Sequence, residues 1–141
     1  MKLKIKKIHP DAKVPTYAHH GDAGFDVYAC EEAALEPGER RTIRLGIAIE
    51  IPHGYVGLVW DKSGLAKNHG IINLAGVIDS GFRGESMILL HNLSDKLYEI
   101  QKHDKIAQML IQPVEIVEIE EAEELSESSR GEGGWGSTGK K

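Results

Sequence analysis

The fold class follows from Thr42-Ile43-Arg44-Leu45-Gly46-Ile47-Ala48-Ile49-Glu50-Ile51, a stretch in which a large apolar side chain occupies every second position. A two-residue period is typical of a β-strand that has one face in a core and the other toward solvent. The pattern therefore predicts one long strand over residues 42–51, with its isoleucines and its leucine on a single buried face.

Shorter β-rich runs lie on both sides of this stretch, at Leu3 and Ile5 and at residues 55–60, 87–91, 106–111 and 114–119. Turn signals such as Glu36-Pro37-Gly38-Glu39 separate them. Many short strands at intervals of roughly ten residues are typical of an antiparallel sandwich, jelly roll or small barrel. We expect an all-β domain whose one short helix covers residues 63–69 and ends at Gly70.

Composition narrows the class of protein. With 141 residues the chain has the size of one domain, and its formal net charge of -5 argues against nucleic acid as the main partner. No run approaches the ~20 apolar residues of a membrane helix, and no His/Cys cluster has zinc-ligand spacing. Cys30 is the single cysteine and is expected to be a buried apolar residue. We expect a soluble, cytoplasmic protein with no membrane partner.

The composition changes after residue 125, which suggests a domain over residues 1–125 and a flexible, glycine-rich tail over residues 126–141. The tail is almost free of aliphatic residues, as is common for disordered termini. However, it contains Trp135, together with Arg130 and the hydroxyls of Ser137 and Thr138 among several glycines. Closely spaced glycines let backbone N–H groups surround an anion. We interpret the tail as a lid that orders over a ligand.

Residues 76–85, Gly-Val-Ile-Asp-Ser-Gly-Phe-Arg-Gly-Glu, predict an exposed hairpin tip. From composition alone, a plain hairpin with Asp79 as a turn residue is the better explanation. The functional interpretation makes Asp79 a base that orients a water molecule and places the ring of Phe82 against a ligand.

Two further stretches are compatible with anion binding. Residues 60–67 place Lys62, Ser63 and Gly64 at a strand-to-helix junction, where a cation and backbone N–H groups could hold a phosphate. A short helix with Ser63 as its N-cap explains the same residues equally well. Gln108 stands among apolar neighbours in a predicted strand, where a solvent-facing glutamine is the commoner case.

Taken in order, five segments resemble the five motifs of the trimeric dUTPase family. They are Asp22-Ala23-Gly24-Phe25-Asp26, Lys62-Ser63-Gly64-Leu65-Ala66, residues 76–85, Asp104-Lys105-Ile106-Ala107-Gln108 and residues 130–139. The resemblance covers about residues 22–139. It implies a β jelly roll assembled as a homotrimer, with each active site built from all three subunits and closed by the tail. The implied reaction is hydrolysis of dUTP to dUMP and pyrophosphate.

The resemblance also assigns roles to residues. Asp79 matches the carboxylate that activates the water attacking the α-phosphorus, and Phe82 matches the aromatic residue that packs on the sugar. The remaining implied substrate contacts are Lys62, Ser63, Gly64 and Gln108 at the phosphates, Asn73 and Ile78 in the hairpin that holds uracil, and Arg130, Trp135, Gly136, Ser137 and Thr138 in the tail. Mg²⁺ is implied as cofactor, bound mainly through substrate phosphates and water, with Asp26 as a supporting carboxylate nearby.

Some positions depart from the usual family pattern. Lys62 stands where arginine is usual, so the charge is kept but the planar fork is lost. Asp61 stands where proline is common, which places an additional carboxylate near the predicted phosphates. Phe82 replaces a common tyrosine, and Trp135 a common phenylalanine.

Two other functions compete with dUTP hydrolysis. A dCTP deaminase, or a bifunctional deaminase and diphosphatase, shares the implied fold and needs a glutamate as proton relay, for which Glu85 is available. A non-catalytic jelly-roll module that only binds nucleotide is the second alternative, although the presence of Asp79 argues against it.

Overall fold

Strands dominate the computed structural model, which describes residues 1–134. This confirms the predicted all-β class with one short helix. In chain order the elements are β1 (Lys4–Lys7), β2 (Phe25–Tyr28), β3 (Ala33–Leu35), β4 (Arg40–Arg44), β5 (Ile47–Glu50), β6 (Tyr55–Trp60), α1 (Ser63–His69), β7 (Ile71–Leu74), β8 (Val77–Ile78), β9 (Met87–Asn92), β10 (Tyr98–Ile100) and β11 (Lys105–Pro113). Among these residues no helix has the length and apolar character needed to cross a membrane.

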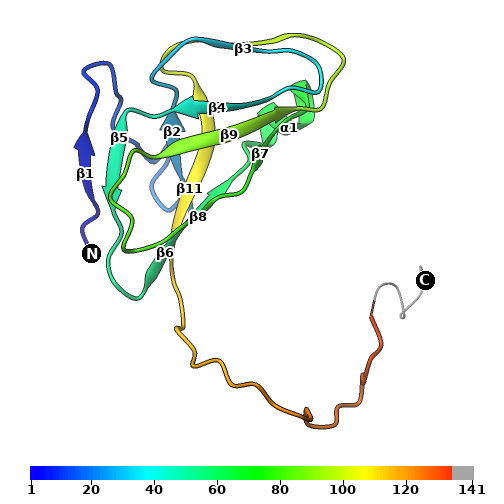
Figure 1. The fold of residues 1–141 in the computed structure, drawn as a ribbon. Coiled ribbons are helices and arrows are strands. Elements are labelled where there is room, and N and C mark those ends of the chain that lie inside the picture. Colours follow the sequence, from blue (N-terminus) through cyan, green and yellow to red (C-terminus); the bar gives the residue numbers. More distant parts are fainter. Residues whose placement is uncertain (135–141) are drawn as a thin grey trace.

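The strands pair antiparallel in four small sheets, ordered β2-β11-β6-β8, β4-β9-β7, β1-β5 and β3-β10. In Figure 1 the sheet of β4, β9 and β7 lies in front of β2 and β11. Ile43 and Leu90 from the first of these sheets join Val27 and Met109 from the second in one core cluster, and all four side chains are almost completely buried. Burial of this apolar surface is the main stabilising contribution to the fold.

The expected single strand over residues 42–51 is wrong in one respect, because the chain bends at Gly46. This glycine has φ of 67°, in the left-handed region, and a Cβ there would lie 2.6 Å from the sulfur of Cys30. The bend transfers the chain from β4, which pairs with β9, to β5, which pairs with β1. The predicted core face is nevertheless confirmed, since all five apolar side chains of the stretch are buried. Cys30 is buried too, as expected.

The helix α1 has the predicted bounds, and Gly70 ends it with φ of 67°. The N-cap is Lys62 rather than Ser63, and no side chain makes a capping hydrogen bond there. The hydroxyl of Ser63, in the first residue of the helix, is therefore not explained by capping.

The strand expected at residues 114–119 is absent, because β11 ends at Pro113 and no strand follows it within the described residues. We call residues 114–134 the arm. In Figure 1 the arm runs away from the sheets, and every residue from 112 to 132 is exposed. A lone extended segment has no neighbouring strand to satisfy its backbone, so its β-rich composition alone does not make it a strand.

Candidate active site

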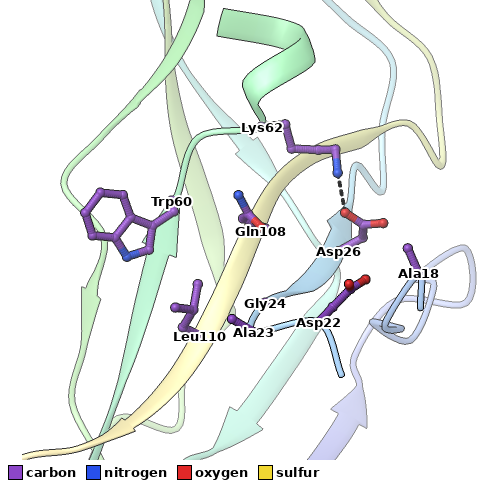
Figure 2. Close-up of a pocket in the computed structure, with 9 residues that line it drawn as sticks. All are labelled: Ala18, Asp22, Ala23, Gly24, Asp26, Trp60, Lys62, Gln108 and Leu110. Atoms are coloured by element: carbon purple, nitrogen blue, oxygen red, sulfur yellow. Dashed lines mark hydrogen bonds and ion pairs between the residues drawn. The ribbon is translucent and has the colours of Figure 1, made fainter. Parts of the chain in front are cut away.

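A row of three residues crosses the outer face of the four-stranded sheet. Gln108 of β11 is in register with Asp26 of β2 on one side and with Trp60 of β6 on the other. Residues paired across antiparallel strands point to the same face. All three side chains line a cavity of about 460 Å³, together with Lys62 and Gly24 (Figure 2).

Asp26 is the buried charge of this cavity, with only 5% of its surface exposed. One carboxylate oxygen pairs with the Lys62 ammonium and the other lies 2.7 Å from Nζ of Lys105 (Figure 2 draws the first pair). Burial acts to raise the pKa of Asp26, but the two lysines outweigh it and hold this pKa below its ordinary value. The carboxylate is therefore ionised at neutral pH and orients both cations.

Gln108 is half-buried rather than solvent-facing, so the commoner expectation for this residue is wrong. Its Nε2 donates a hydrogen bond of 2.8 Å to the carbonyl oxygen of Asp61. Gly24 makes room for it, since a Cβ at that position would lie 3.0 Å from Oε1 of Gln108. Ser63 and Gly64 follow Lys62 directly and are exposed at the start of α1. The residues predicted to bind phosphate therefore cluster in one region.

A second, smaller cavity of about 200 Å³ lies between the β7–β8 connection and β9. Asn73 and Ile78, both predicted to contact the nucleoside, line it. Oδ1 of Asn73 is buried without a hydrogen-bond partner among the described residues, and its Nδ2 makes only a long bond of 3.4 Å to the carbonyl of Val59. An unpaired buried amide oxygen is costly unless a ligand or water completes it.

Asp79 directly follows β8 and is exposed, as expected. The predicted hairpin is wrong, however, because β8 pairs with β6 whereas the next strand, β9, pairs with β4 and β7 in another sheet. Its carbonyl accepts a hydrogen bond of 3.1 Å from the N–H of Phe82, which closes the turn. The Phe82 ring lies on Gly84, where a Cβ would come within 2.7 Å of the ring, and 44% of the residue stays exposed. The turn therefore exposes a carboxylate and an aromatic ring, and it begins directly after Ile78, which lines the smaller cavity.

The predicted site residues fall into two groups within one chain. The larger cavity has Lys62 and Gln108, the smaller has Asn73 and Ile78, and the two cavities share no lining residue. Arg130 lies in the arm, where its Nε donates a bond of 2.6 Å to the carbonyl of Gly133. The remaining tail contacts, Trp135, Gly136, Ser137 and Thr138, lie outside the described residues.

Two residues of this site were not predicted from the sequence. Lys105, a cation two positions along the strand register from Asp26, is a natural ion-pair partner for that carboxylate. Asp61 is the second. Its Oδ1 accepts a bond of 2.5 Å from the backbone N–H of Asn73, a contact between segments that no local pattern predicts.

Comparison with known proteins agrees with this geometry. The family model described as dUTPase matches residues 10–139. The deoxyuridine 5'-triphosphate nucleotidohydrolase of Nautilia profundicola is 49% identical over 142 residues, covering 99% of this chain and 100% of that protein. The chain belongs to the dUTPase family. The deoxyuridine 5'-triphosphate nucleotidohydrolase of Clostridioides difficile is 48% identical over 79% of this chain and 80% of its own length.

Solved dUTPase structures have the same fold. The Staphylococcus bacteriophage 80alpha dUTPase with dUpNHpp superposes with a TM-score of 0.92 at 32% identity, covering 98% of both chains. The D95N mutant of the dUTPase from phage phi11 of S. aureus, which is described as coordinating a structural Mg(II) ion, gives 0.84 at 27% identity over 90% of this chain and 100% of its own. The predicted family and jelly-roll class are thereby confirmed.

Two features of this dUTPase family member bear on metal binding and on the rival deaminase reaction. Within residues 1–134 no group of three or more histidine, cysteine or acidic side chains is placed to hold a metal ion. Glu85, the candidate proton relay, instead receives hydrogen bonds from Nε of Arg44 at 3.0 Å and from the N–H of Gly46 at 3.1 Å. Glu85 therefore holds the bend between β4 and β5 through Arg44 and Gly46.

Proposed function

We propose that this chain hydrolyses dUTP to dUMP and pyrophosphate by attack of water on the α-phosphorus. The observation that carries the proposal is the pair of complementary half-sites, a cationic cavity with amide donors and a small pocket with an unpaired amide beside an exposed aspartate. The relatives described above are named deoxyuridine 5'-triphosphate nucleotidohydrolases, whereas the position of attack and the catalytic roles of individual residues are our inference.

In the phosphate half-site, Lys62 supplies charge, while Ser63 and Gly64 supply a hydroxyl and backbone N–H groups. Because Asp26 already pairs with Lys62, an incoming phosphate has to share or displace that pair. The Gln108 amide is fixed by Asp61 and so keeps its orientation at the cavity. Pre-oriented donors of this kind stabilise the charge that develops during phosphoryl transfer.

In the nucleoside half-site, Asn73 and the backbone around Ile78 bind uracil, and Phe82 packs on the deoxyribose. A pocket of about 200 Å³ accepts one pyrimidine ring more readily than a larger base. The unpaired Oδ1 of Asn73 is completed by the base, so a ligand with the wrong hydrogen-bonding edge leaves it unpaired at a cost of about 1–3 kcal/mol. Asp79 then orients and deprotonates the attacking water.

Magnesium enters this proposal with the substrate. Both oxygens of Asp26 are occupied by lysines, and the described residues offer no other set of ligands. The protein therefore does not fit a resident metal bound by side chains alone in this part of the chain. Mg²⁺ bound by the triphosphate and water would neutralise phosphate charge, with Asp26 as an indirect support through Lys62.

The same observations support a homotrimer with shared sites. The two half-sites are separate cavities in one chain, and the surface between them exposes Trp60 (57%) and Val77 (71%). An exposed apolar surface of this kind is typical of a protein interface. We infer that the larger cavity of one subunit faces the smaller cavity of another.

The arm provides a second contact between subunits. It exposes Ile116 (74%) and Ile119 (91%) among several glutamates. The strand β1 is rich in lysine and pairs only with β5 within the described residues. Beside β1 lies a cavity of about 390 Å³ that includes Leu3 and Ile5. An acidic, apolar arm from one subunit complements this basic edge and apolar cavity on the next.

The tail completes the site from a third subunit. We propose a domain over residues 1–125 and a lid over residues 126–141, with Arg130, Ser137 and Thr138 at the terminal phosphate and Trp135, with Gly136, over the uracil. Closure excludes bulk water and strengthens the electrostatic contacts. That the reaction takes place in the cytoplasm stays a prediction from the sequence.

The decisive experiment measures pyrophosphate release from dUTP, dCTP, dTTP and UTP, with and without Mg²⁺, for the wild type and Asp79→Asn. We expect turnover of dUTP alone. In Asp79→Asn, kcat falls by about 10²–10⁴-fold because the general base is lost, while binding of dUTP is retained. Full activity in the amide variant would remove Asp79 as the base, and ammonia release from dCTP would favour the deaminase.

A further inference from the structure

Asp61 carries a charge that the proposed function does not use. It lies between the end of β6 and Lys62, where a carboxylate opposes binding of a triphosphate. Its side chain does not line the cavity that contains Lys62 and Gln108. It lines a different cavity, of about 570 Å³, together with Asn73 and Gly76. The carboxylate is thus directed to the nucleoside side of the chain.

The Asp61 carboxylate accepts a backbone hydrogen bond from the edge strand β7. Asn73 lies in β7, which pairs with β9 alone and is therefore the edge of its sheet. The N–H of Asn73 donates to Oδ1 of Asp61 at 2.5 Å. Asp61 thus provides the acceptor that a neighbouring strand would otherwise supply, at a residue of β7 that lines the proposed uracil pocket.

The end of β6 also holds the bend at Ala75 and Gly76, which follows β7. The N–H of Val59 donates to the carbonyl of Gly76 at 2.8 Å. Between these contacts the chain turns sharply, with φ of 67° at Ala75 and 137° at Gly76. Asp61 adds its carboxylate to these contacts, through the bond to the Asn73 N–H, and its backbone carbonyl accepts the Gln108 amide at 2.8 Å. Asp61 therefore contacts both Gln108, which is proposed to bind phosphate, and Asn73, which is proposed to bind the base.

We propose that Asp61 is a positioning residue that sets the place of Asn73 for base recognition and ties it to Gln108. The inference rests on the proposed binding roles of Asn73 and Gln108. Asp61 acts through the backbone of β7 and takes no part in water attack. Its removal therefore weakens ground-state binding and base selection, and leaves the chemical step at Asp79 nearly unchanged.

The test uses three substitutions that separate charge from geometry. Asp61→Asn keeps an acceptor oxygen in place without the charge, Asp61→Glu keeps the charge but displaces the acceptor, and Asp61→Ala removes both. We expect KM for dUTP to rise about tenfold in the Ala and Glu variants, with kcat within about twofold of wild type, because one charge-assisted hydrogen bond is lost. The Asn variant stays within about threefold of the wild-type KM, and the preference for dUTP over dCTP narrows only in Ala and Glu.

Asp95→Ala is the control for loss of a negative charge, since the Asp95 side chain makes no hydrogen bond or ion pair within residues 1–134. Calorimetry measures the affinity of each variant for the non-hydrolysable analogue dUpNHpp, and this affinity decides the role of Asp61. Absence of pyrophosphate release by the wild type would contradict only the proposed function. If Asp61→Ala fails to fold, the Glu and Asn variants suffice. Equal loss of affinity in Asn and Glu, an unchanged affinity in Glu, or a fall in kcat alone would overturn the proposal.

Discussion

Residues 43–51 and residues 114–119 are similar in sequence and opposite in structure. Both are rich in large aliphatic side chains with charged residues among them, yet Ile47 and Ile49 are 1% exposed whereas Ile116 and Ile119 are 74% and 91% exposed. The difference lies in the neighbours, because β5 pairs with β1, whereas the arm belongs to no sheet in the described part of its own chain and only its first residue, Val114, bonds to the backbone of the domain, at Gly54. Apolar periodicity indicates that a segment needs a partner, but not on which chain the partner lies.

The largest expected effect on stability comes from placing a charge in the buried stretch, residues 43–51. Ile47→Asp places a carboxylate in the core, where it has neither water nor a cation, and we expect a loss above about 5 kcal/mol and no folded protein. Ile119→Asp adds the same charge to an exposed position and is expected to leave the β-sheet circular dichroism spectrum intact at room temperature. Chemical denaturation of both variants measures the difference. A folded Ile47→Asp protein would contradict the burial of this strand.

The second effect concerns the exposed member. If the arm binds a neighbouring subunit, the double change Ile116→Asp and Ile119→Asp removes two buried side chains from each of three interfaces, about 2–5 kcal/mol apiece. We expect the trimer to dissociate, which sedimentation velocity detects, and dUTP hydrolysis to fall with it because the sites are shared. Leu93→Asp, an exposed apolar residue in a turn, is the matched control. An unchanged trimer in the double variant would show that the arm is not an interface.

The sequence predicted the local elements well where the signal was local. The bounds of α1 and β6, the buried face of residues 43–51 and the exposed tip at Asp79 needed only periodicity and turn residues. Contacts between distant segments could not be predicted in the same way. The bend at Gly46 depends on Cys30 and Ala12 packing against it, and the bond from Asn73 to Asp61 depends on β7 lying beside the end of β6.

A smaller effect on stability is expected from Asp26, whose charge pairs with lysines of its own chain rather than with another subunit. Burial raises the pKa of Asp26, but Lys105 and Lys62 lower it further, so its folded-state pKa is below the ordinary 3.8. The ion pairs therefore contribute stability above pH 3.8, and this contribution is lost as pH falls through 3.8 toward the lowered pKa. We expect Asp26→Asn to cost about 1–3 kcal/mol at neutral pH and to flatten this acid-side loss. Urea denaturation across pH measures both.

Varying the protein concentration distinguishes a contact within one chain, such as that of Asp26, from a contact between chains. Its partners are on the same chain, so the cost of Asp26→Asn is expected to be independent of protein concentration, whereas Glu118→Gln in the arm should alter only the concentration-dependent part of stability. A concentration-dependent cost for Asp26→Asn would indicate that its carboxylate also contacts another subunit.

The smallest expected effect involves Lys4. It pairs with Glu50 within its own chain and is also proposed to face the arm of a neighbouring subunit. Within the chain its ammonium lies 3.1 Å from Oε1 of Glu50, but the two side chains are 76% and 44% exposed, so Lys4→Ala should cost less than about 1 kcal/mol of subunit stability. Between chains, Lys4 lies on the basic edge proposed to receive the acidic arm, and Lys4→Glu should repel both Glu50 and the arm. Because exposed charges are screened, the difference between Ala and Glu should disappear in 1 M salt. A difference that persists in high salt would mean that β1 contacts the arm through packing rather than charge.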